Sequence, residues 1–226
     1  MANQLDLEEQ EQLDQLKAFW KQYGNLITWA VIVVLAAFAG WNLYQRWQTS
    51  QATQASALYD ELDRVVKGGD TAKIDRVFAD LKEKFPSTTY AYQGALLAAK
   101  AYFEAGKAAE SKTALQWVAD KSSDEGIQAI ARLRLASVLL NDKAYDQALT
   151  LLSAKFPPEF AALAADRKGD TFSLQGKKAE ARAEYEKAYK AFDERTEYKR
   201  LVEVKLNALG VNPKPDAPAT PAEAKQ

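Results

Sequence analysis

The stretch Leu26–Tyr44, LITWAVIVVLAAFAGWNLY, determines how the rest of this chain is interpreted. It contains no charged residue, and Lys21 and Arg46 flank it. At ~1.5 Å per residue a helix here is about 28 Å long, close to the ~30 Å hydrocarbon core of a bilayer. Trp and Tyr side chains are common at membrane interfaces. Trp20 and Tyr23 precede the stretch, Trp41 and Tyr44 lie at its end, and Trp47 follows it. The sequence therefore predicts a transmembrane helix over residues 26–44.

Two other interpretations of this stretch remain open. A buried core helix of this length normally carries a polar stripe, which residues 27–38 lack. A cleaved secretory signal normally begins with a basic region. This leader is acidic instead, with Asp6, Glu8, Glu9, Glu11 and Asp14. The small-x-small triplet at residues 37–39, Ala-Phe-Ala, nevertheless resembles a cleavage site.

Composition limits the chemistry that the chain can perform. Its 226 residues allow the membrane segment plus one domain of roughly 160 residues. The 30 Lys and Arg against 31 Asp and Glu give no electrostatic reason to expect a nucleic-acid partner. The absence of histidine and cysteine excludes thiol nucleophiles, imidazole bases, Cys/His zinc sites and disulfides. With no P-loop or GxGxxG motif either, we predict no cofactor, no metal and no enzymatic activity.

The leader, residues 1–25, is predicted to form an amphipathic helix. Its apolar residues recur at three- and four-residue spacing, at Leu13, Leu16, Trp20 and Tyr23. Asp6 and Glu9 have the spacing of a helix-capping pair. The leader is interpreted either as a docking helix for a membrane partner or as a solvated extension of the anchor. Its acidic face argues against binding to anionic lipid, which favours the solvated extension.

The remainder of the chain is predicted to be all-α. No glycine or proline interrupts the pattern after Trp47, so the membrane helix is expected to continue into an amphipathic helix that ends at Gly68-Gly69. A capping box of Ser122 and Glu125 is expected to begin another helix. Further helices are predicted at about residues 74–85, 88–105, 107–119, 145–154, 159–174, 178–192 and 197–209.

A repeat organises these helices into pairs. Lining up the turns places four residues at one equivalent position, separated by 37, 37 and 33 residues: Gly69, Gly106, Lys143 and Gly176. The period is close to the ~34 residues of the tetratricopeptide repeat, whose helix pairs bury their apolar faces against neighbouring pairs. Gly169, Ala181 and Ala188 are expected where helices approach closely, while Ser111 replaces the usual alanine. The predicted fold is one transmembrane helix followed by a tetratricopeptide-like α-solenoid of about four helix pairs.

The helix after the last pair is expected to cap the stack. Its polar face would carry Lys199, Arg200, Glu203 and Lys205. Residues 45–210 therefore form the predicted repeat domain, capping helix included. Beyond it, residues 211–226 are rich in Pro and Ala and are expected to be disordered.

Three short segments carry a family resemblance: ADRKGD at 165–170, LRLA at 133–136 and VKLNAL at 204–209. Together with the membrane helix and the repeats, they resemble the YfgM family, the tetratricopeptide-like ancillary subunit of the bacterial SecYEG translocon. The resemblance covers about residues 19–209. It implies an inner-membrane protein with residues 1–25 in the cytoplasm and 45–210 in the periplasm. It also implies two partners, SecYEG and the membrane-anchored chaperone PpiD.

A partner-binding groove is expected on the concave surface formed by the first helix of each pair. The repeat register places these residues there: Tyr59, Asp63, Lys100, Phe103, Leu133, Ser137, Leu140, Asn141, Asp166 and Asp170. Phe103 and Leu140 among polar groups suit apolar stretches of unfolded secreted polypeptides. The alternative is that the apolar members belong to the core and the polar members are simply solvated.

Asp166 and Asp170 lie one helical turn apart and have the spacing of a general acid–base pair. Arg167 and Lys168 beside them favour ordinary ion pairing on the helix surface. A carboxylate-based hydrolase is disfavoured, since a repeat stack offers a groove and not an enclosed pocket. The predicted function is a membrane-anchored interaction module that scaffolds a periplasmic chaperone and assists secreted chains as they emerge. The alternative is a cytoplasm-facing adaptor for a membrane complex, without chaperone activity.

Overall fold

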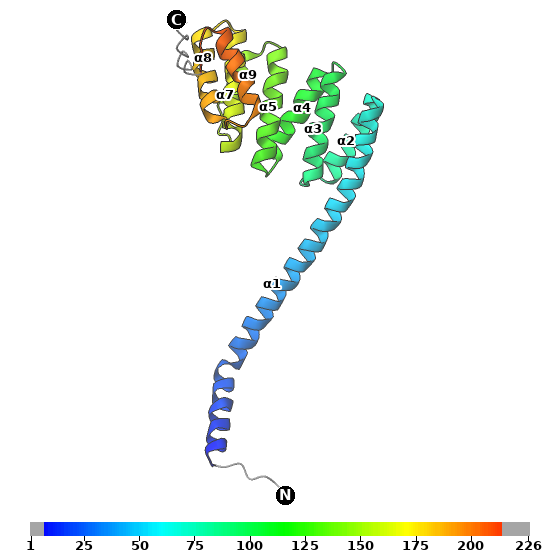
Figure 1. Ribbon diagram of the computed structural model, residues 1–226. Helices are drawn as coiled ribbons and strands as arrows, with labels where there is room; N and C mark the ends of the chain where they lie inside the picture. The colour runs from blue at the N-terminus through cyan, green and yellow to red at the C-terminus, as the bar shows by residue number, and fades with distance from the viewer. Residues whose placement is uncertain (1–6, 214–226) are drawn as a thin grey trace, which may run out of the picture. The chain divides into compact units, whose positions relative to one another are not determined.

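The computed structural model describes residues 7–213, and over that range every regular element is an α-helix. Figure 1 shows their order along the chain. The helices are α1 Leu7–Gly68, α2 Thr71–Lys84, α3 Thr89–Glu104, α4 Ala108–Lys121, α5 Glu125–Asn141, α6 Tyr145–Leu152, α7 Pro158–Leu174, α8 Lys178–Ala191 and α9 Glu197–Ala208. The all-α prediction is confirmed. The predicted Asp6 cap and the tail from residue 214 lie outside the described residues.

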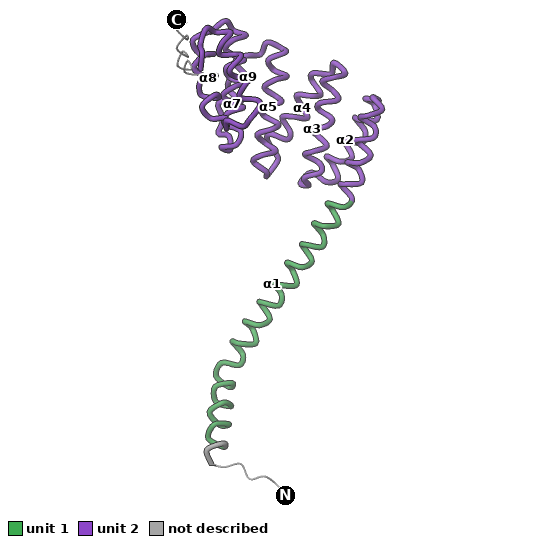
Figure 2. Tube along the Cα trace, viewed as in Figure 1, with its two compact units in different colours: residues 1–53 green, residues 54–226 purple. Residues whose placement is uncertain are grey.

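The chain divides into two compact units, residues 1–53 and 54–226, coloured separately in Figure 2. The boundary falls within α1, which runs from Leu7 to Gly68 without a break, as expected. In the first unit α1 is long and apolar enough to cross a membrane, with a mean hydropathy of 2.0 over its most apolar window. None of that window is buried, so the core-helix interpretation is not supported.

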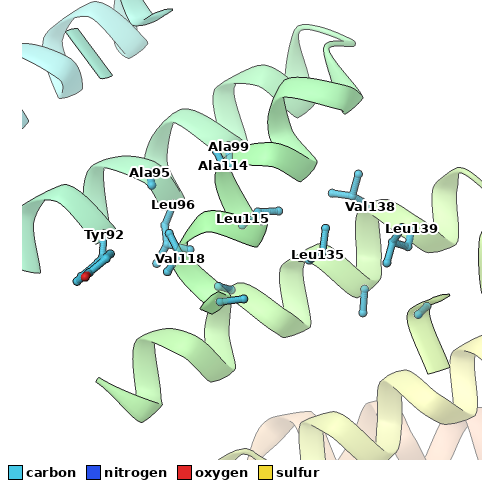
Figure 3. Close-up of a cluster of buried hydrophobic side chains, with 14 of the residues drawn as sticks. Tyr92, Ala95, Leu96, Ala99, Ala114, Leu115, Val118, Leu135, Val138 and Leu139 are labelled. Carbon is cyan, nitrogen blue, oxygen red and sulfur yellow. The ribbon is translucent and has the colours of Figure 1, made fainter. Parts of the chain in front are cut away.

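The second unit is held together by three clusters of buried side chains. The central one draws on α3, α4, α5 and α6, and Figure 3 shows Leu96, Leu115 and Leu135 among its members. A second cluster joins the end of α1 to α2 and α3, and a third joins α8 to α9. The first two clusters each join one helix pair to the next, and the third joins the last pair to α9, as expected for a stack of repeats.

The turns between paired helices repeat one backbone conformation. The aligned residues all have positive φ, as does the glycine that follows the C-cap of α9: Gly69 (72°), Gly106 (75°), Lys143 (58°), Gly176 (75°) and Gly210 (80°). In the turns at Gly106, Lys143 and Gly176, the backbone N–H of the next residue donates to the carbonyl five residues earlier. These bonds run from Lys107 to Tyr102 at 2.8 Å, from Ala144 to Leu139 at 2.9 Å and from Lys177 to Phe172 at 2.9 Å. This is the Schellman ending of a helix, and it confirms the predicted repeat register.

The small residues of the repeat act where the helices cross. A Cβ on Gly169 would lie 2.4 Å from the ring of Tyr185, so only glycine allows α7 and α8 to approach this closely. Ala181 and Ala188 of α8 are fully buried. Ser111 fits at a position usually held by alanine because its buried hydroxyl donates to the Ala99 carbonyl at 2.8 Å.

The predicted capping box at the start of α5 is wrong. Asp124 is the N-cap, and its carboxylate accepts the Ile127 N–H at 2.8 Å. The Ser122 hydroxyl instead accepts the Asp124 N–H at 3.1 Å, within the preceding turn. The helix begins at Glu125, so Asp124 is the residue whose carboxylate reaches the N–H groups of the first turn.

Candidate partner-binding groove

Two hollows are lined mostly by the first helices of the pairs, α3, α5 and α7, with further residues from α4 and α8. The first has a volume of about 420 Å³ and is lined by Ala99, Lys100, Phe103, Ser111, Leu115, Arg134, Ser137 and Val138. The second, of about 380 Å³, is lined by Ser137, Leu140, Asn141, Arg167, Asp170, Ser173, Leu174 and Tyr185. Ser137 of α5 lines both hollows, so the two hollows adjoin at this residue and are together called the groove below.

Helical periodicity explains why these residues meet. Residues three and four apart share a helix face, so α5 places Arg134, Ser137 and Asn141 along one stripe. On α7, Arg167, Asp170 and Leu174 follow the same spacing. The small Ala99 and Ser111 leave space at the floor of the first hollow, where larger side chains would fill it.

The first hollow is apolar with a basic rim. Phe103 is 40% exposed, which leaves a large part of its ring available for contact. Lys100 pairs with Glu104 at 3.7 Å, but both side chains are well exposed and such pairs are weak. The Arg134 guanidinium donates to the Leu96 carbonyl at 3.3 Å. Within residues 10–213 no carboxylate pairs with it, so this hollow carries net positive charge.

The second hollow contains a carboxylate whose charge is already satisfied. Asp170 Oδ1 accepts the Lys205 ammonium at 2.6 Å and the Tyr185 hydroxyl at 2.8 Å. Its Oδ2 accepts Arg167 at 3.1 Å. Leu174, at the rim, is 57% exposed. The hollow therefore offers apolar surface beside a neutralised acid.

Behind this hollow Asp170 belongs to a charge cluster that joins α7, α8 and α9. Asp166, with no exposed surface, accepts Lys205 Nζ at 2.7 Å and the Tyr198 hydroxyl at 2.9 Å. Burial raises the pKa of Tyr198 to about 12, and the charge of Asp166 adds to the shift. Burial likewise raises the pKa of Tyr185, helped by Asp170. Both phenols thus stay protonated as donors to the carboxylates over the physiological range.

The structure places most of the predicted groove residues along the hollows: Lys100, Phe103, Ser137, Leu140, Asn141 and Asp170. Leu133 is half-buried against the central core and lines neither hollow. Tyr59 lies on α1 with its ring centroid 6.0 Å from that of Tyr90. Asp63 pairs along the same helix with Lys67. The role of all these residues in partner binding stays a prediction.

Asp166 is not on the groove surface, contrary to expectation. Asp166 lies in the interior and forms an ion pair with Lys205 of α9. The prediction that Asp166 forms an ordinary ion pair on the helix surface is therefore wrong. The predicted ion pairing between neighbours on α7 is observed for Asp170 and Arg167. Lys205 was expected on the solvated face of the capping helix, but it points inward and its side chain is only 21% exposed. Sequence reasoning also missed Arg134 and Leu174, although both continue the helical spacing of predicted residues.

Other features of the described residues offer less chemistry. No group of three or more Asp, Glu, Cys or His side chains between residues 10 and 213 is arranged to hold a metal ion. A larger hollow, of about 780 Å³, lies over α4, α5 and α6 and includes Trp117, Leu135 and Leu139. Leu135 and Leu139 are only 4% and 7% exposed, while Trp117 is half-buried, and none of the predicted groove residues lines this hollow.

Comparison with known proteins gives a consistent picture. The family described as "Tetratricopeptide repeat-like domain" matches residues 17–211. A protein of Neisseria gonorrhoeae, named ancillary SecYEG translocon subunit, is 32% identical over 204 residues, which cover 90% of this chain and 98% of the relative. Proteins of the same name from Haemophilus influenzae and Escherichia coli are 30% and 27% identical, over 90% of this chain and 98% and 97% of their own lengths. No solved structure matches the chain significantly.

Proposed function

The chain belongs to the tetratricopeptide repeat-like family of ancillary SecYEG translocon subunits, and from this premise we propose that it is a membrane-anchored module that holds protein partners beside the translocon. The observation that carries the proposal is the pair of adjoining hollows that share Ser137. Repeat stacks bind extended or helical segments along such a surface. The partners proposed are SecYEG, the membrane-anchored chaperone PpiD and secreted chains as they emerge.

The shape and charge of the groove support binding over catalysis. Both hollows are open and shared between helices, so a polypeptide can lie along them. The carboxylate pair with acid–base spacing that the sequence analysis singled out, Asp166 and Asp170, is saturated by Lys205, Arg167 and two tyrosine hydroxyls. General acid–base catalysis needs a group that is free to exchange its proton with a substrate. We therefore propose a non-catalytic role.

The location proposed is the inner membrane, with residues 1–25 in the cytoplasm and 45–210 in the periplasm. Two observations support the anchor: an apolar window with no buried residue, and the exposed rings near both ends of residues 26–44. Lys17 and Lys21 before the span, against Arg46 after it, favour the leader on the cytoplasmic side. The groove would then face the side on which secreted chains emerge.

Site-specific photo-crosslinking in native membranes tests this function. A photoreactive amino acid at Phe103 or Leu174 should yield adducts with a translocon subunit, a chaperone or a secreted chain. The matched control is Lys190, an exposed residue of α8 that lines neither hollow. Absence of adducts from the groove positions, or equal yields from Lys190, would contradict the proposal.

A further inference from the structure

The acid of the second hollow is neutralised by a residue that does not itself line the hollow. Asp170 is part of the lining, while Lys205, which pairs with it at 2.6 Å, belongs to α9. The pairing joins residues 35 positions apart in the sequence. An element expected only to cap the stack therefore contributes directly to the electrostatics of the groove.

Lys205 is held in a position that suits this role. Its ammonium bridges Asp166 at 2.7 Å and Asp170 at 2.6 Å, and lies 5.3 Å from the ring centroid of Tyr185. A lysine ammonium has three N–H donors, so it can donate to two carboxylates and contact an aromatic face at the same time. Because Asp166 is fully buried, removing the Lys205 ammonium would leave its charge without an ionic partner.

The charges of the cluster balance. Asp166 and Asp170 carry one negative charge each, and Lys205 and Arg167 carry one positive charge each. Removing the charge of Lys205 alone would leave net negative charge beside the apolar rim formed by Leu174. A partner segment with a carboxylate would then be repelled, and one with a lysine attracted, because charges act strongly in partly desolvated sites.

We infer that Lys205 is a specificity-determining residue, which neutralises Asp166 and Asp170 from α9 and so adapts the second hollow to uncharged, apolar segments of an extended partner chain. This inference rests on the function proposed above. It assigns the capping helix a second task, because the same lysine that fixes α9 against α7 also sets which side chains the groove accepts. Lys205 acts through Asp170 and is a positioning residue in that sense.

The test compares charge preference across a set of variants of the full chain in lipid nanodiscs. The probes are three fluorescent twelve-residue Gly/Ser peptides with a central Leu-Leu, Leu-Lys or Leu-Glu pair, and binding is followed by anisotropy. The wild-type affinities for the three peptides are the reference, because the basic first hollow also contributes to them. Lys205→Met should raise affinity for the Leu-Lys peptide relative to the Leu-Glu peptide by about tenfold, the size of one partly buried charge interaction.

Two further variants separate charge from structure. Asp166→Asn leaves net positive charge and should shift the preference toward the Leu-Glu peptide. The double variant Asp166→Asn with Lys205→Met restores neutrality and should restore the wild-type preference, while Lys205→Arg should keep it. If the role of Lys205 were only structural, Lys205→Met would weaken the binding of all three peptides by the same factor. If that variant fails to fold, Asp166→Asn still tests the inference through the opposite shift.

The outcomes distinguish this inference from the proposed function. If the wild-type protein binds a peptide but neither Lys205→Met nor Asp166→Asn changes the charge preference, the inference is overturned and the proposed function stands. Wild type that binds none of the three peptides would overturn the proposed function and the inference together.

Discussion

Lys143 holds a backbone conformation that every equivalent turn gives to glycine. Its φ is 58°, in the left-handed region, where a Cβ costs roughly 1–2 kcal/mol. Lys143→Gly should therefore raise the free energy of unfolding by about 0.5–1 kcal/mol, because the added entropy of glycine in the unfolded chain offsets part of the gain. Urea denaturation followed by circular dichroism measures the change.

The matched control for Lys143→Gly is the reverse change at an equivalent turn. Gly176→Ala, at a φ of 75°, should lower the free energy of unfolding by about 1 kcal/mol. A stabilising effect of alanine at Gly176, or a destabilising effect of glycine at Lys143, would contradict the shared turn conformation.

Gly169 makes the contact between α7 and α8 possible. Gly169→Ala would place a Cβ 2.4 Å from the ring of Tyr185, whose hydroxyl is fixed to Asp170. The ring cannot withdraw without breaking that bond, so the variant should lose about 1–3 kcal/mol of stability. Gly68→Ala is the control, since its Cβ would meet nothing within 4 Å. Equal melting temperatures for the two variants would count against the close approach.

The contact of α9 with α7 and α8 should weaken at alkaline pH. Tyr198 has a pKa of about 12 in the folded chain against an ordinary value of 10.0, so the folded state holds this proton more tightly. The resulting stability is complete below about pH 10 and decreases as the pH rises toward 12. Tyr198→Phe removes this contribution and should flatten the dependence between pH 10 and 12. A parallel decline in wild type and variant would show that Tyr198 does not contribute.

Helix positions were predictable because their signals are local. The predicted helix at 178–192 is observed as Lys178–Ala191, and α2 ends at Lys84, ahead of Pro86. Apolar spacing sets the phase of such helices, and glycine or proline ends them. Lys143 shows that the period could identify a turn even where glycine is missing.

Pairing between distant elements was not predictable from the same signals. A lysine at position 205, on a helix with other exposed charged residues, has the local pattern of a solvated side chain. Its actual partners lie on α7, 39 and 35 residues earlier, and no periodicity connects them. The predicted residues Phe103 and Leu140 do line the two hollows, while the charge balance of the hollows depends on contacts that only the folded chain reveals.

At the scale of the whole molecule the proposed topology is the claim with the widest consequences. The groove can meet emerging secreted chains only if the second unit lies in the periplasm. The natural sequence contains no cysteine, so a single introduced thiol reports its own location without background. Lys17 and Lys190 suit this purpose, since both are exposed and they lie on opposite sides of the predicted span, residues 26–44.

Single-cysteine variants Lys17→Cys and Lys190→Cys should react differently with a membrane-impermeant maleimide. With only the outer membrane permeabilised, the Lys190→Cys thiol should be labelled and the Lys17→Cys thiol protected until detergent is added. Lys17 pairs with Asp14 at 3.1 Å, and both side chains are well exposed, so losing this ion pair should cost little stability. The reverse pattern would favour the cytoplasm-facing adaptor. Labelling of both thiols before detergent would contradict a single span, since one crossing between residues 17 and 190 must place them on opposite sides.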